Sequence, residues 1–135
     1  MRIAVLVALL SLCQVQDDLA KLQGTWKRVD AEVEGKKLPA AELQTTSLTI
    51  QKNKYTLNMG GQVRTGTLKL DPSKTPKHID LSSDAGPNKG KILPGIYELD
   101  GDVFKYALSG PGKDRPTDFT AKPGQSVFVN KRAGP

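Results

Sequence analysis

The chain has 135 residues, of which 37% are hydrophobic and 25% are charged, and its formal net charge is +6 at pH 7. These proportions are typical of one globular domain, and they exclude a disordered chain, a coiled coil, a collagen and a multi-span membrane protein. The basic residues recur in isolated pairs with acidic residues between them, which indicates a solvated surface of mixed charge rather than a nucleic-acid footprint. We therefore expect a monomer with no nucleic-acid partner.

The N-terminus is typical of a secretory signal peptide. A positive start at Arg2 is followed by an apolar run over residues 3–12 that is too short to span a membrane as a helix. We assign residues 1–13 to the signal peptide and residues 14–135 to the mature domain. The sequence thus predicts a secreted or periplasmic protein.

The sequence allows two ways of processing the signal peptide. Small side chains at Ser11 and Cys13 favour ordinary cleavage after Cys13. Alternatively, Leu10–Cys13 resembles a bacterial lipobox, with Leu12 where a small residue is usual, and Cys13 would then carry lipid and anchor the protein at the cell surface. Such an anchor is the one membrane contact that we expect. In neither case can a disulfide form within the domain, because Cys13 is the single cysteine.

A short helix is predicted over residues 17–23. Leu19 and Leu22 are three residues apart and share one face. Acidic residues stand at its start, where the helix dipole favours them, and Gly24 ends it.

After Gly24 the apolar pattern changes to a period of two, which indicates strands. The first strand is predicted over residues 25–34, with one face formed by Val29, Ala31 and Val33. Because Trp26 is out of phase with that face, we expect a β-bulge near Lys27-Arg28.

Seven further strands follow at near-regular spacing. They are predicted at 46–50, 55–59, 62–70, 79–81, 92–99, 104–108 and 126–132, with one helical turn at 39–43 and a long linker at 110–124. Most connections carry hairpin turn signals, so the strands form an antiparallel meander. Closure removes the exposed edges of such a sheet. The predicted fold class is therefore all-β, an eight-stranded antiparallel up-and-down barrel with a short N-terminal helix.

The segment that opens the first strand resembles the lipocalins and related calycin barrels. It carries the Gly-x-Trp pattern at Gly24 and Trp26. The resemblance implies that Trp26 plugs the closed end of the barrel and that a basic side chain of the last strand, Arg132, stacks over it.

A second resemblance covers residues 19–132. It is carried by Leu22–Trp26, Asp71–Lys74 with Pro76-Lys77 and Ile79-Asp80, Gly86–Gly90, Gly95–Asp102 and Arg115–Phe119. These motifs look like those of an uncharacterised family of small secreted domains, abundant in planctomycete bacteria and treated as lipocalin-like. This resemblance implies a fold and carries no established activity.

The sequence offers little for catalysis. His78 is the single histidine, and no set of residues has metal-ligand spacing around it. The glycine-rich segment at residues 86–91 lacks the P-loop pattern and the helix that follows it, so a structured turn is favoured over a phosphate site. We predict no catalytic residues, no metal, no cofactor and no enzymatic activity. A hydrolase would require two carboxylates facing each other in a cleft.

An eight-stranded barrel either fills its interior with side chains or holds one small ligand. We favour a secreted, non-enzymatic binding protein whose cavity holds a small apolar or amphipathic molecule. The predicted cavity walls are drawn from Tyr55, Leu57, Leu68, Leu70, Tyr97, Phe104, Tyr106, Val127 and Val129. The alternative is a structural or protein-interaction module with a filled barrel.

Overall fold

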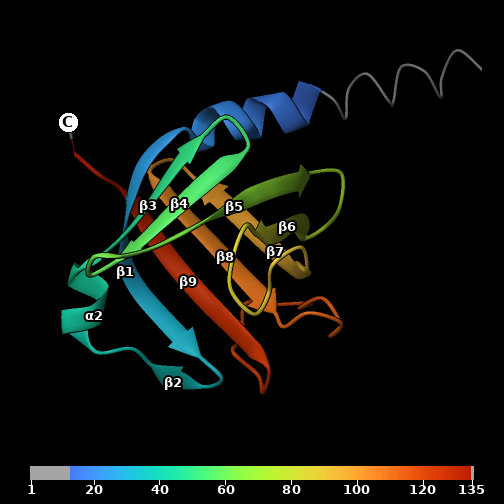
Figure 1. The fold of residues 1–135 in the computed structure, drawn as a ribbon. Coiled ribbons are helices and arrows are strands. Elements are labelled where there is room, and N and C mark those ends of the chain that lie inside the picture. The colour runs from blue at the N-terminus through green and yellow to red at the C-terminus, as the bar shows by residue number, and fades with distance from the viewer. Residues whose placement is uncertain (1–12, 135) are drawn as a thin grey trace, which may run out of the picture.

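A computed structural model describes residues 13–134 and shows a closed antiparallel β-barrel (Figure 1). The predicted signal peptide therefore lies outside the described residues, apart from Cys13. The secondary-structure elements are β1 Gly24–Val33, β2 Lys36–Lys37, α2 Ala40–Gln44, β3 Thr46–Gln51, β4 Lys54–Met59, β5 Gln62–Asp71, β6 Lys77–Ser83, β7 Ile92–Asp100, β8 Val103–Ser109 and β9 Gln125–Arg132.

The barrel consists of eight strands in sequence order. β1 pairs with β3, each later strand pairs with the next, and β9 pairs back with β1 to close the sheet. All pairings between these strands are antiparallel, which confirms the predicted up-and-down barrel. The two-residue strand β2 was not predicted; it folds back as a hairpin onto the end of β1.

A helix over residues 13–22 lies across one end of the barrel (Figure 1). Leu19 and Leu22 of this helix pack into the barrel core, and Leu22 is fully buried. Asp18 is buried as well, and it accepts hydrogen bonds from Tyr97 Oη at 2.6 Å and Lys77 Nζ at 2.9 Å. The described part of the helix extends four residues further toward the N-terminus than the predicted one, and these contacts make it the lid of the closed end. Within residues 13–134, no helix combines the length and apolar character needed to cross a membrane.

Two apolar clusters lie on opposite sides of the sheet. The larger one fills the barrel interior and includes the side chains of Trp26, Leu48 and Phe104. The smaller one lies outside, where the segment after β8 covers the sheet; it consists of Ile96, Ala107 and Val127, with Phe119 and Ala121 packed against them. The long linker is therefore not a free loop, because its apolar residues complete this outer cluster.

The predicted β-bulge in β1 is present, slightly later than expected. The pairing of β1 with β9 shifts register between Arg28 and Asp30. Val29 is the extra residue, and 43% of its surface is exposed. The expectation that Val29 lies on one face with Ala31 was therefore wrong. Before the bulge, the inward positions are those of Trp26 and Arg28.

Candidate functional site

Trp26 occupies the closed end of the barrel. It is fully buried, and its indole Nε1 donates a hydrogen bond to the carbonyl oxygen of Leu22 at 2.9 Å. The Arg132 guanidinium carbon lies 4.3 Å from the indole centroid, and Arg132 Nη1 donates to the carbonyl oxygen of Gln23 at 2.9 Å. Gly24 precedes this contact with a φ of +110°, a conformation that other residues rarely adopt. These residues join the lid helix, β1 and β9 into one closed base.

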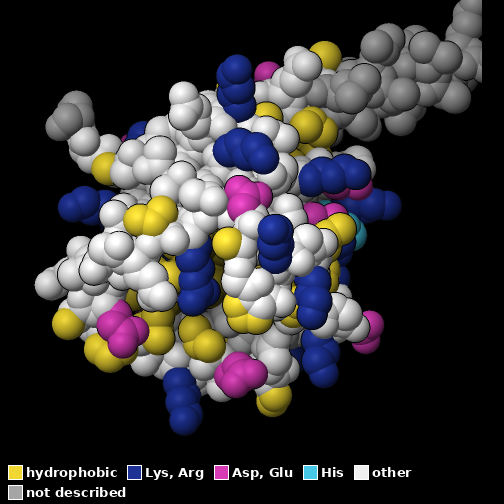
Figure 2. All heavy atoms as spheres, in the orientation of Figure 1, with side chains coloured by type: hydrophobic (Ala, Val, Ile, Leu, Met, Phe, Trp, Pro, Cys, Tyr) yellow, Lys and Arg dark blue, Asp and Glu magenta, His cyan; other side chains and the backbone are white. Residues whose placement is uncertain are grey.

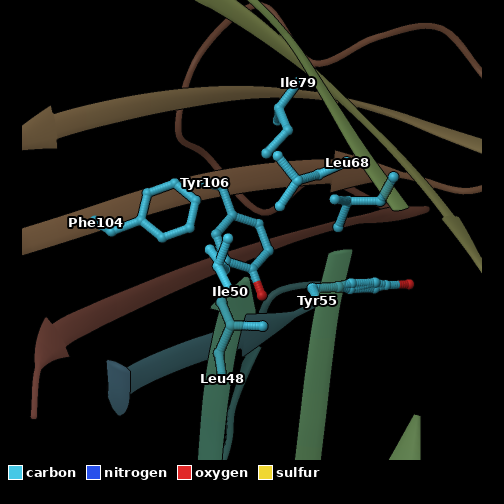
Figure 3. Close-up of a pocket in the computed structure, with 8 residues that line it drawn as sticks. Leu48, Ile50, Tyr55, Leu68, Ile79, Phe104 and Tyr106 are labelled. Carbon is cyan, nitrogen blue, oxygen red and sulfur yellow. The ribbon is translucent and has the colours of Figure 1, made fainter. Parts of the chain in front are cut away.

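Directly above this base the interior is packed. Figure 3 shows side chains from β3, β4, β5, β6 and β8 converging on a small cavity. Its volume is about 30 Å³, and its walls are apolar and aromatic: Leu48, Ile50, Tyr55, Leu68, Ile79, Leu81, Phe104 and Tyr106. Space of this size is of the order of one water molecule. This inner cavity is therefore part of the core and leaves no room for a ligand.

A much larger cavity lies toward the opposite, open end. Its volume is about 320 Å³. Apolar walls are contributed by Val33, Leu57, Leu81, Leu93, Leu108 and Phe128, and polar groups toward the loops by Glu34, Arg64, Ser83, Asn88, Ser109 and Ser126. Because Glu34 and Arg64 are exposed, this outer cavity reaches solvent. The barrel thus has a sealed base and an accessible upper half.

Three side chains line both cavities and form the partition between them: Tyr55, Leu81 and Tyr106. The ring of Tyr55 lies against Gly66, and its hydroxyl donates to the carbonyl oxygen of Ser82 at 3.1 Å. A Cβ on Gly66 would overlap the carbonyl oxygen of Ser82 and the Tyr55 ring. Only glycine at this position leaves room for the Tyr55 ring to lie flat against the barrel wall. In that position the ring forms the floor of the outer cavity.

Arg28 also lines the outer cavity, although only 6% of its surface is exposed. Its guanidinium carbon lies 4.2 Å from the ring centroid of Phe128. Its Nε donates to Asn130 Oδ1 at 3.3 Å, and its Nη2 donates to the Tyr106 hydroxyl. Among residues 13–134, no carboxylate lies within 4.0 Å of this guanidinium. A buried positive charge thus faces the cavity without an acidic partner.

Two neighbours hold Arg28 in place. Asn130 is fully buried, and its Nδ2 donates to the carbonyl oxygen of Phe104 at 3.1 Å, which turns its oxygen toward Arg28. Burial raises the pKa of Tyr106, although the charge and hydrogen bond of Arg28 act in the opposite direction. The Tyr106 phenol therefore stays neutral at ordinary pH and does not serve as the counter-charge.

The predicted cavity residues separate into four groups. Tyr55, Leu57 and Tyr106 line the outer cavity, and Leu68 and Phe104 line the inner one. Leu70 and Tyr97 are buried in the interior core and line neither of these two cavities. Val127 packs in the outer cluster, and strand alternation places Val129 on the same outward face. For β9 the predicted inner face was thus wrong, because Phe128 and Asn130 are the residues that face inward.

Sequence reasoning missed Arg28, Asn130 and Phe128. For Arg28 a signal was present: it stands two residues after Trp26, so if Trp26 plugs the barrel, Arg28 must also point inside. The basic pair Lys27-Arg28 instead suggested an exposed surface. In the structure Lys27 is exposed and Arg28 is buried.

The outer surface carries mixed charge. Figure 2 shows lysine and arginine side chains spread over the visible face with acidic side chains between them. Cys13, the first residue that the structure describes, lies in the lid helix and is exposed. His78 is half-buried on β6, and burial together with nearby Arg115 lowers its pKa. Within residues 13–134, no three His, Cys, Asp or Glu side chains gather as a metal site would require.

The barrel geometry is compatible with a lipocalin-like fold. No protein-family model, curated protein or solved structure matches the chain.

Proposed function

We propose that this chain is a non-enzymatic binding protein that holds a small apolar or amphipathic molecule in the outer cavity. The observation that carries the proposal is the cavity of about 320 Å³ above a sealed base. Ligand sites in proteins have volumes of roughly 300–1,000 Å³, with mostly apolar walls and a few polar groups that fix orientation. The outer cavity has that composition, with leucine and phenylalanine walls and polar residues at its open end.

The contrast between the two halves of the barrel supports a ligand over a filled interior. Protein cores are close-packed and leave few voids larger than a water molecule. The lower half follows this rule, since its cavity is about 30 Å³. The upper half leaves about ten times more space beside apolar side chains. A barrel built only as a scaffold for its loops would gain stability from larger side chains there.

The proposal extends to the kind of protein. We place the chain among lipocalin-like binding barrels that act outside the cytoplasm, and its resemblance to small planctomycete domains belongs to the same proposal. The sealed base and open mouth support this assignment. Under the lipobox alternative, Cys13 at the start of the lid helix would turn the closed end toward the membrane and leave the cavity mouth facing away.

Uptake of the neutral fluorescent probe N-phenyl-1-naphthylamine tests the proposal. The full-length chain is expressed, purified as the host processes it, and freed of bound lipid before titration. We expect saturable fluorescence enhancement, because the probe leaves water for the apolar walls. Leu57→Trp fills the cavity from β4 and should abolish the enhancement.

The matched control is Thr56→Trp. Thr56 is the neighbouring residue on the same strand, and it is exposed on the outer face. This variant adds the same indole outside the barrel and should leave probe uptake unchanged. Absence of uptake by the unmodified protein, or equal uptake by Leu57→Trp, would contradict the proposal and favour the filled interaction module.

A further inference from the structure

We infer that the ligand of the outer cavity is an organic acid whose carboxylate pairs with Arg28 and whose apolar part lies along the leucine walls. This inference rests on the proposed function and deepens it by naming the chemical class of the ligand. It follows from one feature: Arg28 is a buried arginine, with 6% of its surface exposed, that lines the cavity and has no acidic partner within residues 13–134.

A buried arginine without a counter-charge is unusual. Charged side chains are almost never fully buried unless they are paired, because removal of a charge from water is unfavourable. The guanidinium group keeps its proton at any physiological pH, so it remains charged when it is buried. Glu34, the acidic residue that lines the same cavity, is exposed and accepts a hydrogen bond from the Gly124 backbone N–H at 3.2 Å. The site therefore lacks one negative charge, which a bound anion would supply.

The hydrogen-bonding capacity around Arg28 is also incomplete. Arginine carries five N–H groups. The described residues accept from two of them, at Nε and Nη2, and three are left: both Nη1 hydrogens and the second Nη2 hydrogen. Tyr106 accepts from Arg28 and has no acceptor for its own hydroxyl hydrogen among the described residues. The Nη1 group and the Tyr106 hydroxyl are thus two donors available to one anion.

These donors fit a carboxylate attached to an apolar body. One guanidinium neutralises one negative charge, and its planar fork matches the geometry of a carboxylate. Phe128 stacks on Arg28 and Asn130 fixes its Nε, so the charged group is held before the ligand arrives. The walls beside it are the side chains of Leu57, Leu81 and Leu108, which would contact an aliphatic or aromatic tail.

The test compares three probes that share one tail: octanoate, 1-octanol and octylammonium. Their affinities for the lipid-free, full-length protein are measured by isothermal titration calorimetry at neutral pH. We expect octanoate to bind about tenfold or more tightly than 1-octanol, because a hydrogen-bonded ion pair contributes more than a neutral contact. Octylammonium should bind weakest, because its charge has the sign of Arg28.

Variants identify the residue responsible. Arg28→Met introduces an uncharged side chain of similar length and should remove the preference for octanoate over 1-octanol. Tyr106→Phe should weaken the binding of octanoate several-fold. The control is Lys69→Met, which removes one positive charge from the exposed face of β5.

A stability measurement separates this role from a structural one. Arg28→Met removes an uncompensated buried charge but also leaves the buried Asn130 Oδ1 without its donor, so the effect of octanoate is compared within each protein and not between their ligand-free melting temperatures. Octanoate should raise the melting temperature of the unmodified protein and not that of Arg28→Met.

The outcomes distinguish the two proposals. Equal binding of octanoate and 1-octanol, or an undiminished preference in Arg28→Met, would overturn the inference and leave the proposed function standing. Uptake of N-phenyl-1-naphthylamine without octanoate binding would also overturn the inference and leave the proposed function standing. Failure of both the neutral probe and octanoate to bind would overturn the proposed function together with the inference.

Discussion

Replacement of Trp26 by alanine should remove much of the stability of the domain. Trp26 is fully buried, packs edge-on against Phe104 with ring centroids 5.7 Å apart, and lies under Arg132. A large aromatic side chain buries roughly 150–250 Å², which corresponds to ~4–6 kcal/mol at about 25 cal/mol per Å². Alanine keeps part of that burial, so we expect a loss of about 3–5 kcal/mol in the free energy of unfolding.

Urea denaturation followed by circular dichroism measures this loss. With an m-value of about 1–3 kcal/mol per M for a small protein, the midpoint should fall by ~1 M or more. Trp26→Phe keeps an aromatic ring, so it should destabilise the protein less than Trp26→Ala does. Because it leaves the Leu22 carbonyl without its donor, the free energy of unfolding should still fall by ~1–3 kcal/mol. Val63→Ala, at an exposed position of β5, should change the stability by less than ~0.5 kcal/mol. If Trp26→Ala behaved like this surface control, Trp26 would not be the base of the barrel.

Two further predictions concern Gly66 and the buried phenols. Gly66→Ala should destabilise the protein by about 1–3 kcal/mol in urea denaturation and change the near-ultraviolet circular dichroism, because the new Cβ displaces Tyr55 or the strand beside it. A normal stability with an unchanged spectrum would show that the wall has more room than the structure indicates. Burial raises the pKa of Tyr106, and burial with the Asp18 hydrogen bond raises the pKa of Tyr97, whereas both phenols ionise near ~10 in the unfolded chain. The unfolded state then binds fewer protons than the folded one, so the free energy of unfolding should fall as pH rises above ~10, with tyrosine ionisation and unfolding coinciding in ultraviolet absorbance. Ionisation of Tyr97 and Tyr106 near ~10 in a protein that remains folded would contradict the burial of these two phenols.

The barrel itself could be predicted because its strands alternate clearly and are separated by turn residues. In β3 the positions of Leu48 and Ile50 are buried and Thr49 is exposed, as a period of two requires. The contact of Trp26 with Arg132 was implied by the resemblance to calycin barrels, and the structure has the two side chains in contact. The alternation rule works where one face of a strand meets water.

The inner face of β9 was predicted wrongly because it is the more polar face: Ser126, Phe128 and Asn130 point inward, and the valines point outward. Val127 meets Phe119 of the covering segment outside, while Phe128 meets Arg28 inside. The period of two therefore indicated the wrong face, because the covering segment, rich in proline and glycine, has no pattern that predicts its packing over β9. The two apolar valines of β9 suggested an inner face that Phe128 and Asn130 in fact occupy.

The position of Arg28 depends on the bulge in β1. A register shift after Arg28 lets Trp26 and Arg28 point inward on one side of it and Ala31 on the other. Without the extra residue at Val29, burial of Trp26 would turn Ala31 outward. A one-residue irregularity therefore places a positive charge in the cavity and still keeps the end of β1 in register with β9.

The central claim, that the outer cavity holds the ligand, is tested most directly by nitrogen-15 NMR of the full-length protein titrated with N-phenyl-1-naphthylamine. The aromatic rings of the probe shift the resonances of nearby amides. The structure predicts the largest changes at cavity residues such as Leu57, Leu108 and Phe128, and little change at Ile96 and Phe119 of the outer cluster. Changes confined to the outer cluster, or no changes at saturating probe, would contradict the account.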